Sequence, residues 1–239
     1  MEPLPDISPV LARAAIVIDD FGQDVEMAKR FLKIPLQITF SVLPFLSHST
    51  EIAGIAHAGR RQVILHLPME PQGYPSINPG PGALLISMPN ERIRKAVRTA
   101  LNTSPHYAGM NNHMGSRFTE HASFMREVLS ELRQRRLYYL DSCTSPQSTG
   151  YSLARELHVL TARRDIFLDH NPSEASVRMQ VNQFIQKARA NGSAIAIGHP
   201  HEATLRVLEL EAPRFRQEGI AIVPAGDLMA GRSGETKGR

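Results

Sequence analysis

The amino-acid sequence predicts an α/β fold, with parallel strands forming a (β/α) barrel of seven to eight strands. Short apolar runs typical of buried strands alternate seven or eight times with amphipathic segments typical of helices. The 239 residues suffice for one large domain, and 42% hydrophobic with 21% charged residues is ordinary globular composition. A doubly wound open sheet is the alternative, but the number of repeats favours a closed barrel.

The first half of the domain is expected to contain three strands and two helices. The strands are predicted at 15–18 (AIVI), 36–42 (LQITFSV) and 62–67 (QVILHL), and the helices between them at 24–33 and 47–59. Asp24 is the expected N-cap of the first helix, and Gly59 closes the second. Pro35 separates the first helix from the second strand.

The second half continues the same alternation. Helices are predicted at 90–101, 119–135, 152–157, 172–190 and 205–217, and strands at 107–112, 137–141, 165–169, 194–198 and 220–223. The long helix should begin at Asn171-Pro172 and stop at Asn191-Gly192. We expect residues 1–12 to form a surface arm, 13–230 the single domain, and 231–239 a disordered tail.

Residues 68–89 interrupt this rhythm with six prolines and three glycines in twenty-two positions. Loops of this length are uncommon in compact domains and are usually functional lids or disordered. The apolar run ALLIS within the segment favours a lid packed on the domain rather than a linker between two domains.

Composition and motifs exclude several functions. The net charge of +4 is mild and the arginines are scattered over predicted helices, which argues against a nucleic-acid partner. No strand is followed by a glycine-rich nucleotide fingerprint, and no G-x-S-x-G motif supports a serine hydrolase. The single cysteine, Cys143, cannot form an internal disulfide. No stretch approaches the roughly 18 apolar residues that span a bilayer.

Polar side chains gather at the predicted strand ends, which share one rim in a parallel barrel. They are Asp19 and Asp20, His66 with Glu70, Asn111 to His113, Asp141, Asp169 with His170, and His199 with His201. Singly, each carboxylate could cap a helix and each histidine could bond a carbonyl. Together, imidazoles and carboxylates suit a catalytic zinc or similar divalent ion. Because strand residues alternate in direction, Asp19 and Asp20 should face opposite sides and differ in role.

Five motifs then resemble, in order, the divergent branch of the polysaccharide deacetylases: AAIVIDDFG, VILHLPMEP, GMNNHMGSRF, YLDS and AIGHPH. The resemblance implies a distorted (β/α) barrel and metal-dependent removal of acetyl groups from N-acetylated sugars. It also implies that Asp19 is the catalytic base, Asp20 and His66 are metal ligands, and His199 is the general acid. Asp141 is expected to orient the base or the acid.

The sequence departs from the wider superfamily at two places. The usual His-x3-His pair becomes His66 and Glu70, so either Glu70 or His113 completes the metal site, and we favour His113. The usual Arg-x-Pro motif is replaced by NNHMGSRF, where Arg117 could compensate. His201 is an additional histidine, and Asn112, Arg117 and His201 are the expected substrate-binding residues.

The resulting hypothesis is a zinc-dependent hydrolase of carbohydrate metabolism that acts on an acetylated amino-sugar polymer or oligosaccharide. An envelope glycan as substrate would imply a periplasmic or exported protein of the cell envelope. The alternative is a non-catalytic module that uses the same barrel to bind a glycan or a partner protein. A metal-dependent phosphoesterase is a third possibility.

Overall fold

The computed structural model describes residues 11–229, so most of the expected arm and the expected tail (231–239) lie outside the described residues. The sheet begins at Ala12, which pairs with Ile220, one residue before the predicted start of the domain. None of the described helices is long and apolar enough to cross a membrane.

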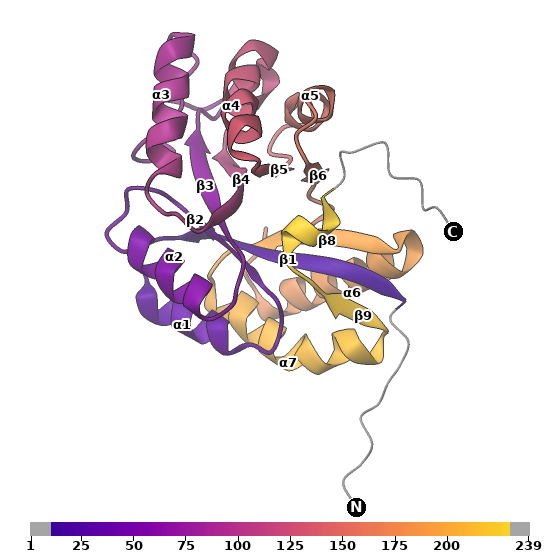
Figure 1. Cartoon of the computed structure of the whole chain (residues 1–239). Helices are drawn as coiled ribbons and strands as arrows, with labels where there is room; N and C mark the ends of the chain where they lie inside the picture. The colour runs from indigo at the N-terminus through magenta and orange to yellow at the C-terminus, as the bar shows by residue number, and fades with distance from the viewer. Residues whose placement is uncertain (1–10, 230–239) are drawn as a thin grey trace, which may run out of the picture.

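All described strands belong to one parallel sheet covered by helices on its outer side (Figure 1). The strands are β1 (Ala12–Phe21), β2 (Thr39–Val42), β3 (Val63–Met69), β4 (Tyr107–Met114), β5 (Tyr138–Asp141), β6 (Thr161–Arg163), β7 (Ile166–Phe167), β8 (Ser193–Gly198) and β9 (Ile220–Ile222). The helices are α1 (Val25–Lys33), α2 (Ser49–Ala58), α3 (Asn90–Leu101), α4 (Ala122–Arg135), α5 (Gly150–Glu156), α6 (Glu174–Asn191) and α7 (Glu202–Gln217).

The sheet curls into a distorted barrel, as predicted, but the barrel stays open. The strand order is β6-β5-β4-β3-β2-β1-β8-β7, with β9 beside the start of β1, and within residues 11–229 no pairing joins β6 to β7. The chain divides at this opening: Arg164 N–H donates to Asp141 O on one side, and Asp165 N–H donates to Ile195 O on the other. Arg164 thus bonds to β5 and the next residue, Asp165, bonds to β8, so the sheet of the described residues has two free edges here, at β6 and β7. The closed barrel that the number of strands predicted does not form.

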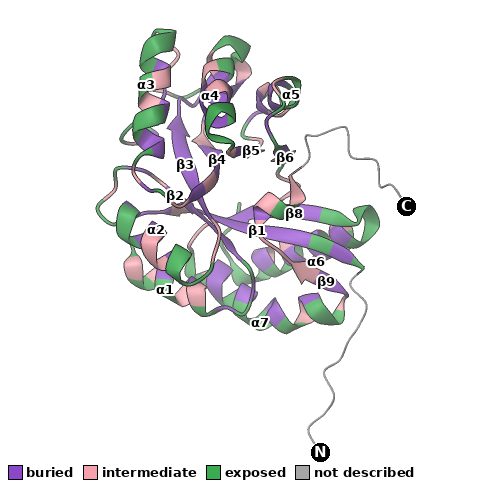
Figure 2. Cartoon of the chain, in the orientation of Figure 1, coloured by how far each residue is buried: buried purple, intermediate pink, exposed green. Residues whose placement is uncertain are grey.

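Two hydrophobic layers hold the barrel together. Alternate residues of β1 point inward, where Ala15 and Val17 meet apolar residues of β3, β5 and β8. The other set, including Ile16 and Ile18, packs against the helices. Figure 2 accordingly shows buried strands and helices with one buried and one exposed face. A 3₁₀ turn at Ala225–Leu228 packs at the end of the barrel formed by the amino ends of the strands, where Ala225 N–H donates to Thr39 Oγ1 (3.0 Å).

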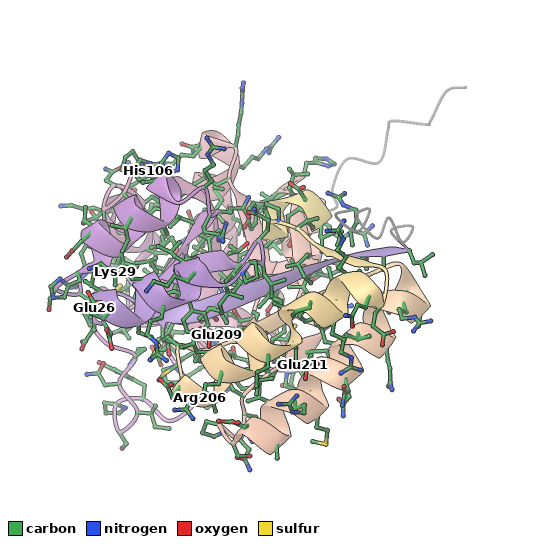
Figure 3. The ribbon with its side chains drawn as sticks, turned by 90° about the horizontal axis from the view of Figure 1, so that it is seen from below. Glu26, Lys29, His106, Arg206, Glu209 and Glu211 are labelled. Carbon is green, nitrogen blue, oxygen red and sulfur yellow. The ribbon has the colours of Figure 1, made fainter. Side chains whose placement is uncertain are left out.

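The helices on the lower side are joined by surface ion pairs. Arg30 of α1 binds Glu202 at the start of α7 (2.6 Å), and α7 also packs along α6. Lys29 and Arg206 mark this outer face in Figure 3. Because these pairs are well exposed, they stabilise the fold only weakly.

Most predicted elements are present, with shifted ends. Strands β1, β3 and β4 run two or three residues further than expected, so Asp19, Asp20 and His113 lie within the last residues of the strands rather than after them. Strand β6 was not expected. Asp24 caps α1 as predicted by accepting from Met27 N–H, whereas α6 is capped by Ser173 rather than started by Asn171-Pro172. Helix α7 begins at Glu202, three residues early.

The segment 70–89, which was expected to form a packed lid, packs against the barrel. It contains no helix or strand beyond a single bridge between Met69 and Leu84, and Leu84 is fully buried. Leu84 N–H donates to Pro68 O, and Glu70 N–H donates to Leu84 O, both at 2.9 Å. The apolar run in this segment therefore anchors the lid to the end of β3.

Candidate metal centre and active site

Three of the predicted metal ligands meet at the end of the barrel formed by the carboxyl ends of the strands. Asp20 comes from β1, His66 from β3 and His113 from β4. Asp20 Oδ1 lies 2.9 Å from His113 Nδ1 and 3.1 Å from His66 Nε2. The two imidazole nitrogens are themselves 3.1 Å apart. The structure thus brings together side chains that are up to about a hundred residues apart in the chain.

The end of β1 is bent so that both of its carboxylates face this cluster. Asp20 has a left-handed φ of 58°, and the pairing of β1 with β2 shifts between Ile18 and Phe21. His66 Nε2 lies 3.6 Å from Asp19 Oδ2 as well as 3.1 Å from Asp20 Oδ1. The prediction that Asp19 and Asp20 face opposite sides is therefore wrong, because it assumed a regular strand. Strained backbone of this kind costs about 1–3 kcal/mol and is common at functional sites.

The donor set fits a divalent cation such as zinc. Among the described residues, no donor makes a well-aligned hydrogen bond to the buried Asp20 Oδ1, despite the two imidazoles beside it. A buried carboxylate oxygen without a partner is costly unless a cation compensates it. His66 Nδ1–H donates to Asn111 Oδ1 (2.7 Å), which leaves the Nε2 lone pair directed at Asp20 when the ring is neutral. Two imidazoles and one carboxylate are a catalytic zinc arrangement.

The pKa shifts of Asp20 and His66 also suit the binding of a cation in place of a proton. Burial tends to raise the pKa of Asp20, but contacts with His113 and His66 and their charges hold it well below its ordinary value. Burial tends to lower the pKa of His66, but the charges of Asp19 and Asp20 raise it overall. In the metal-free protein the carboxylate is thus ionised, and the site favours the protonated form of His66 more than free solution does, so a bound cation would compete with that proton.

Asn111 links the metal cluster to the predicted base. Its side-chain Nδ2 donates to Asp19 Oδ1 (2.8 Å), while its Oδ1 accepts from His66 Nδ1 and from Ser41 Oγ (2.7 Å). All four residues are buried. From the sequence, the neighbouring Asn112 was expected to have a functional role instead. Strand parity could have identified Asn111, because Asn111 and His113 lie two residues apart on one face of β4.

Asn112 faces the other side of β4, where it organises a loop. Its Oδ1 accepts from Tyr139 OH and from Ser142 N–H, at 3.0 and 3.1 Å. Its Nδ2 donates to Met114 O (2.8 Å) and to Thr144 Oγ1 (3.2 Å). The expectation that Asn112 binds substrate is therefore corrected, because its hydrogen-bonding capacity is used within the protein.

His199, the predicted general acid, lies across the cluster and is held by Asp169. Its Nδ1–H donates to Asp169 Oδ1 (2.9 Å), and its Nε2 lies 3.9 Å from Asp20 Oδ2. Burial tends to lower the pKa of His199, but the bond to Asp169 and the charges of Asp19, Asp169 and Asp20 raise it to about 9. His199 therefore carries a proton at neutral pH, as a general acid requires.

Asp141 was expected to orient the base or the acid, and its contacts show otherwise. Asp141 Oδ1 accepts from Cys143 N–H, while Oδ2 accepts from Ser148 Oγ and Tyr151 N–H, at 2.8–3.1 Å. These bonds shape the loop after β5 and the start of α5. The orienting residues are Asn111 and Asp169 instead. Asp169 could have been inferred, since it is the last residue of the predicted strand 165–169, and His199 follows the next predicted strand along the chain.

The buried Glu70 and the half-exposed Arg117 form an ion pair with each other rather than part of the metal cluster. Glu70 Oε1 binds Arg117 Nη1 (3.0 Å), and Glu70 Oε2 accepts from Ile86 N–H (2.8 Å). Glu70 O also accepts from Arg117 N–H and Phe118 N–H. Of the two residues proposed to complete the metal site, the geometry thus selects His113. Glu70 joins the lid to the connection after β4, and Arg117 is its partner.

His201 lies beside His199 at the mouth of the site. The two ring centroids are 5.8 Å apart, and His201 is exposed at the N-cap position of α7. Asp169, His199 and His201 each place one ligand atom within 4.8 Å of the others. Both oxygens of Asp169 already accept hydrogen bonds, so this second group lacks the free ligand atom of the first.

Comparison with known proteins defines the class of this fold and site. Residues 16–229 match the family described as divergent polysaccharide deacetylase, and the chain belongs to this family. The uncharacterized protein YibQ of Escherichia coli K12 is 41% identical over 223 residues, which cover 93% of this chain and 69% of that protein.

Solved structures show the same architecture. An uncharacterized protein from Agrobacterium tumefaciens C58 superposes with a TM-score of 0.88 at 25% identity, covering 95% of this chain and 92% of that one. The catalytic domain of a peptidoglycan N-acetylglucosamine deacetylase from Eubacterium rectale has a TM-score of 0.55 at 12% identity, covering 94% of each chain. A CE4 family pseudoenzyme from Bacillus anthracis has a TM-score of 0.55 at 13% identity, covering 92% of this chain and 66% of that one. These two likenesses concern the fold alone.

Proposed function

We propose that this protein is a metal-dependent hydrolase that removes N-acetyl groups from an amino-sugar polymer. The observation that carries the proposal is the buried Asp20 Oδ1, which faces two imidazole nitrogens and accepts no aligned hydrogen bond from the described residues. Asp19 Oδ2 lies 3.6 Å from His66 Nε2, and Nε2 of the protonated His199 lies 3.9 Å from the other carboxylate oxygen of Asp20, Oδ2. A cation site with a base and an acid beside it suits hydrolysis of an amide.

The cation would be held by Asp20, His66 and His113. Bound there, a divalent ion such as zinc supplies a Lewis acid that polarises a carbonyl and lowers the pKa of a water molecule. His66 is held for this purpose by Asn111, and Asn111 is held in turn by Ser41. Such supporting bonds fix the ring and increase ligand basicity.

Asp19 and His199 would move the two protons of the reaction. Asp19 accepts a proton from the attacking water, while Asn111 Nδ2 fixes its other oxygen. The water oxygen adds to the carbonyl carbon, and the C–N bond then breaks. His199 Nε2 donates its proton to the departing amine nitrogen, while Asp169 holds the ring in place. The products are a free amine on the sugar and a carboxylic acid.

The family and the named activity of the Eubacterium rectale neighbour support an acetylated sugar as substrate. We extend the proposal to a glycan of the cell envelope, which would place the protein in the periplasm or outside the cell. His201 is the proposed additional contact to the sugar, because it is exposed beside His199.

The test combines metal analysis with acetate release. The purified protein is expected to contain a divalent metal and to release acetate from acetylated chitooligosaccharides or peptidoglycan fragments. Asp19→Asn should abolish release, while the matched control Asp227→Asn, at the opposite end of the barrel beside Arg13, should not. Absence of metal, and no acetate with zinc, cobalt or nickel added, would overturn the proposal. Glycan binding without turnover would then identify a non-catalytic module.

A further inference from the structure

A hollow lies on the same rim and shares Asp20 with the candidate metal centre. It has a volume of about 320 Å³ and lies between the end of β1, the start of α1, the loop after β2 and the residue after His199. Asp20 forms part of its wall. The other walls include Phe21, Met27, Leu43, Leu46 and Pro200.

The walls of this hollow suit an apolar group. Asp20 is directed at the imidazoles of the metal cluster, and Asp24 Oδ1 already accepts from Met27 N–H (2.8 Å). Gln23 is the remaining polar residue in the wall. The other five of the eight residues that line the hollow are apolar, which favours an apolar group over a sugar ring with its several hydroxyl groups.

The size of the hollow exceeds that of an acetyl group. One water molecule occupies about 30 Å³ of liquid. A volume of about 320 Å³ therefore accommodates about ten groups of that size, and acetyl has only three heavy atoms. A longer chain would fill space that acetyl leaves open, and each additional buried methylene strengthens binding.

We propose that this hollow binds the acyl chain of the substrate, and that the preferred chain is longer than acetyl. The inference rests on the proposed function, because it places the scissile carbonyl at the site formed by Asp20, His66 and His113. From there the chain runs past Asp20 between Leu43 and Leu46. The chemistry is unchanged: water adds to the carbonyl carbon, the C–N bond breaks, and the products are the longer carboxylic acid and the amine.

The experiment measures binding without turnover. Calorimetry on zinc-loaded Asp19→Asn protein would use chitotriose N-acylated with acetyl, butyryl or hexanoyl groups. We expect affinity to rise about four-fold per methylene, which corresponds to about 0.8 kcal/mol. Leu46→Trp, which fills the hollow, should remove most of this rise, and Leu210→Trp should not, because Leu210 lies 65% exposed on the outside of α7.

The possible outcomes separate this inference from the proposed function. Equal affinity for all three chains, no binding of any, or an undiminished rise in a folded Leu46→Trp protein would each overturn the inference. Acid release by the parent protein is measured in parallel. Release of acetate without a chain-length effect would leave the hydrolase and remove the acyl pocket. If affinity rises with chain length but no acid is released, the acyl-binding pocket is supported and the hydrolase activity is contradicted.

Discussion

Two groups of one carboxylate and two imidazoles lie on the same rim of this barrel, but their carboxylates differ in hydrogen bonding. The first group is Asp20, His66 and His113, and the second is Asp169, His199 and His201. In the first group, Asp20 Oδ1 is buried and has no aligned donor within residues 11–229. In the second, Asp169 accepts from His199 Nδ1, from His199 N–H and from Thr204 Oγ1, at 2.6–2.9 Å. Both groups contain residues whose ligand atoms lie within 4.8 Å of one another.

The difference teaches that hydrogen-bond saturation, rather than residue type, separates a metal site from an orienting pair. A saturated carboxylate has no remaining need for a cation and fixes the position and proton of its histidine. An unsaturated buried carboxylate is stable only when positive charge approaches it. Substitutions in the two groups and their supporting residues test this contrast.

Asp20→Asn should reduce zinc affinity by more than about 100-fold, because it removes the charged ligand itself. Loss of a residue that only supports a ligand typically costs about 10–100-fold. Competition against a zinc indicator measures the dissociation constant, and circular dichroism verifies the fold. Asp169→Asn is the matched comparison and should change zinc affinity by less than about ten-fold. Equal losses in the two variants would contradict the proposed separation of roles.

His113→Ala should weaken zinc binding by about 100-fold, because it removes one of the two imidazole ligands. His201→Ala should leave the zinc dissociation constant unchanged, since this ring belongs to the saturated group. Glu70→Gln should also retain zinc, because Glu70 binds Arg117 and Ile86 instead. Retention of zinc by His113→Ala together with its loss in Glu70→Gln would assign the third ligand to the alternative residue.

Asn111→Leu should weaken zinc binding by about 10–100-fold without touching a ligand, because His66 loses the partner of its Nδ1. The substitution also removes the hydrogen bond to Asp19 Oδ1. We therefore expect kcat to fall even at saturating zinc, where the loss of metal affinity no longer matters. Asn112→Leu is the neighbouring control and should affect stability rather than zinc affinity. An unchanged dissociation constant in a folded Asn111→Leu protein would exclude the supporting role.

Asp169→Asn should lower the pKa of His199 from about 9, since the burial that opposes its charge remains while the bond to an anion is lost. NMR titration of the metal-free protein measures this value directly. A raised native pKa stabilises the fold fully below the unfolded value of about 6.5, and the stabilisation is lost as pH rises through about 9. The free energy of unfolding should therefore decline across this window in the parent and less in the variant.

The sequence by itself determined the class of fold and the three side chains of the candidate metal cluster. Apolar periodicity is a local property, so strands and helices could be located, and the five ordered motifs pointed to the deacetylase barrel. The shared rim of parallel strands grouped Asp20, His66 and His113 with the other polar strand ends, and the resemblance to the deacetylases then implied which of them bind metal, with Glu70 as the alternative to His113. The ends of the strands and the short β6 were missed, since they depend on pairing with distant strands rather than on local pattern.

Only the tertiary structure decided how the polar residues divide their tasks. The bend at Asp20 directs two adjacent carboxylates to one cluster, against the alternation of a regular strand. The bond between Asn111 and Asp19 joins residues 92 positions apart, and that between His199 and Asp169 spans 30. Hydrogen bonds of this kind form where the folded chain brings donors and acceptors within about 3 Å, a distance that no sequence pattern encodes.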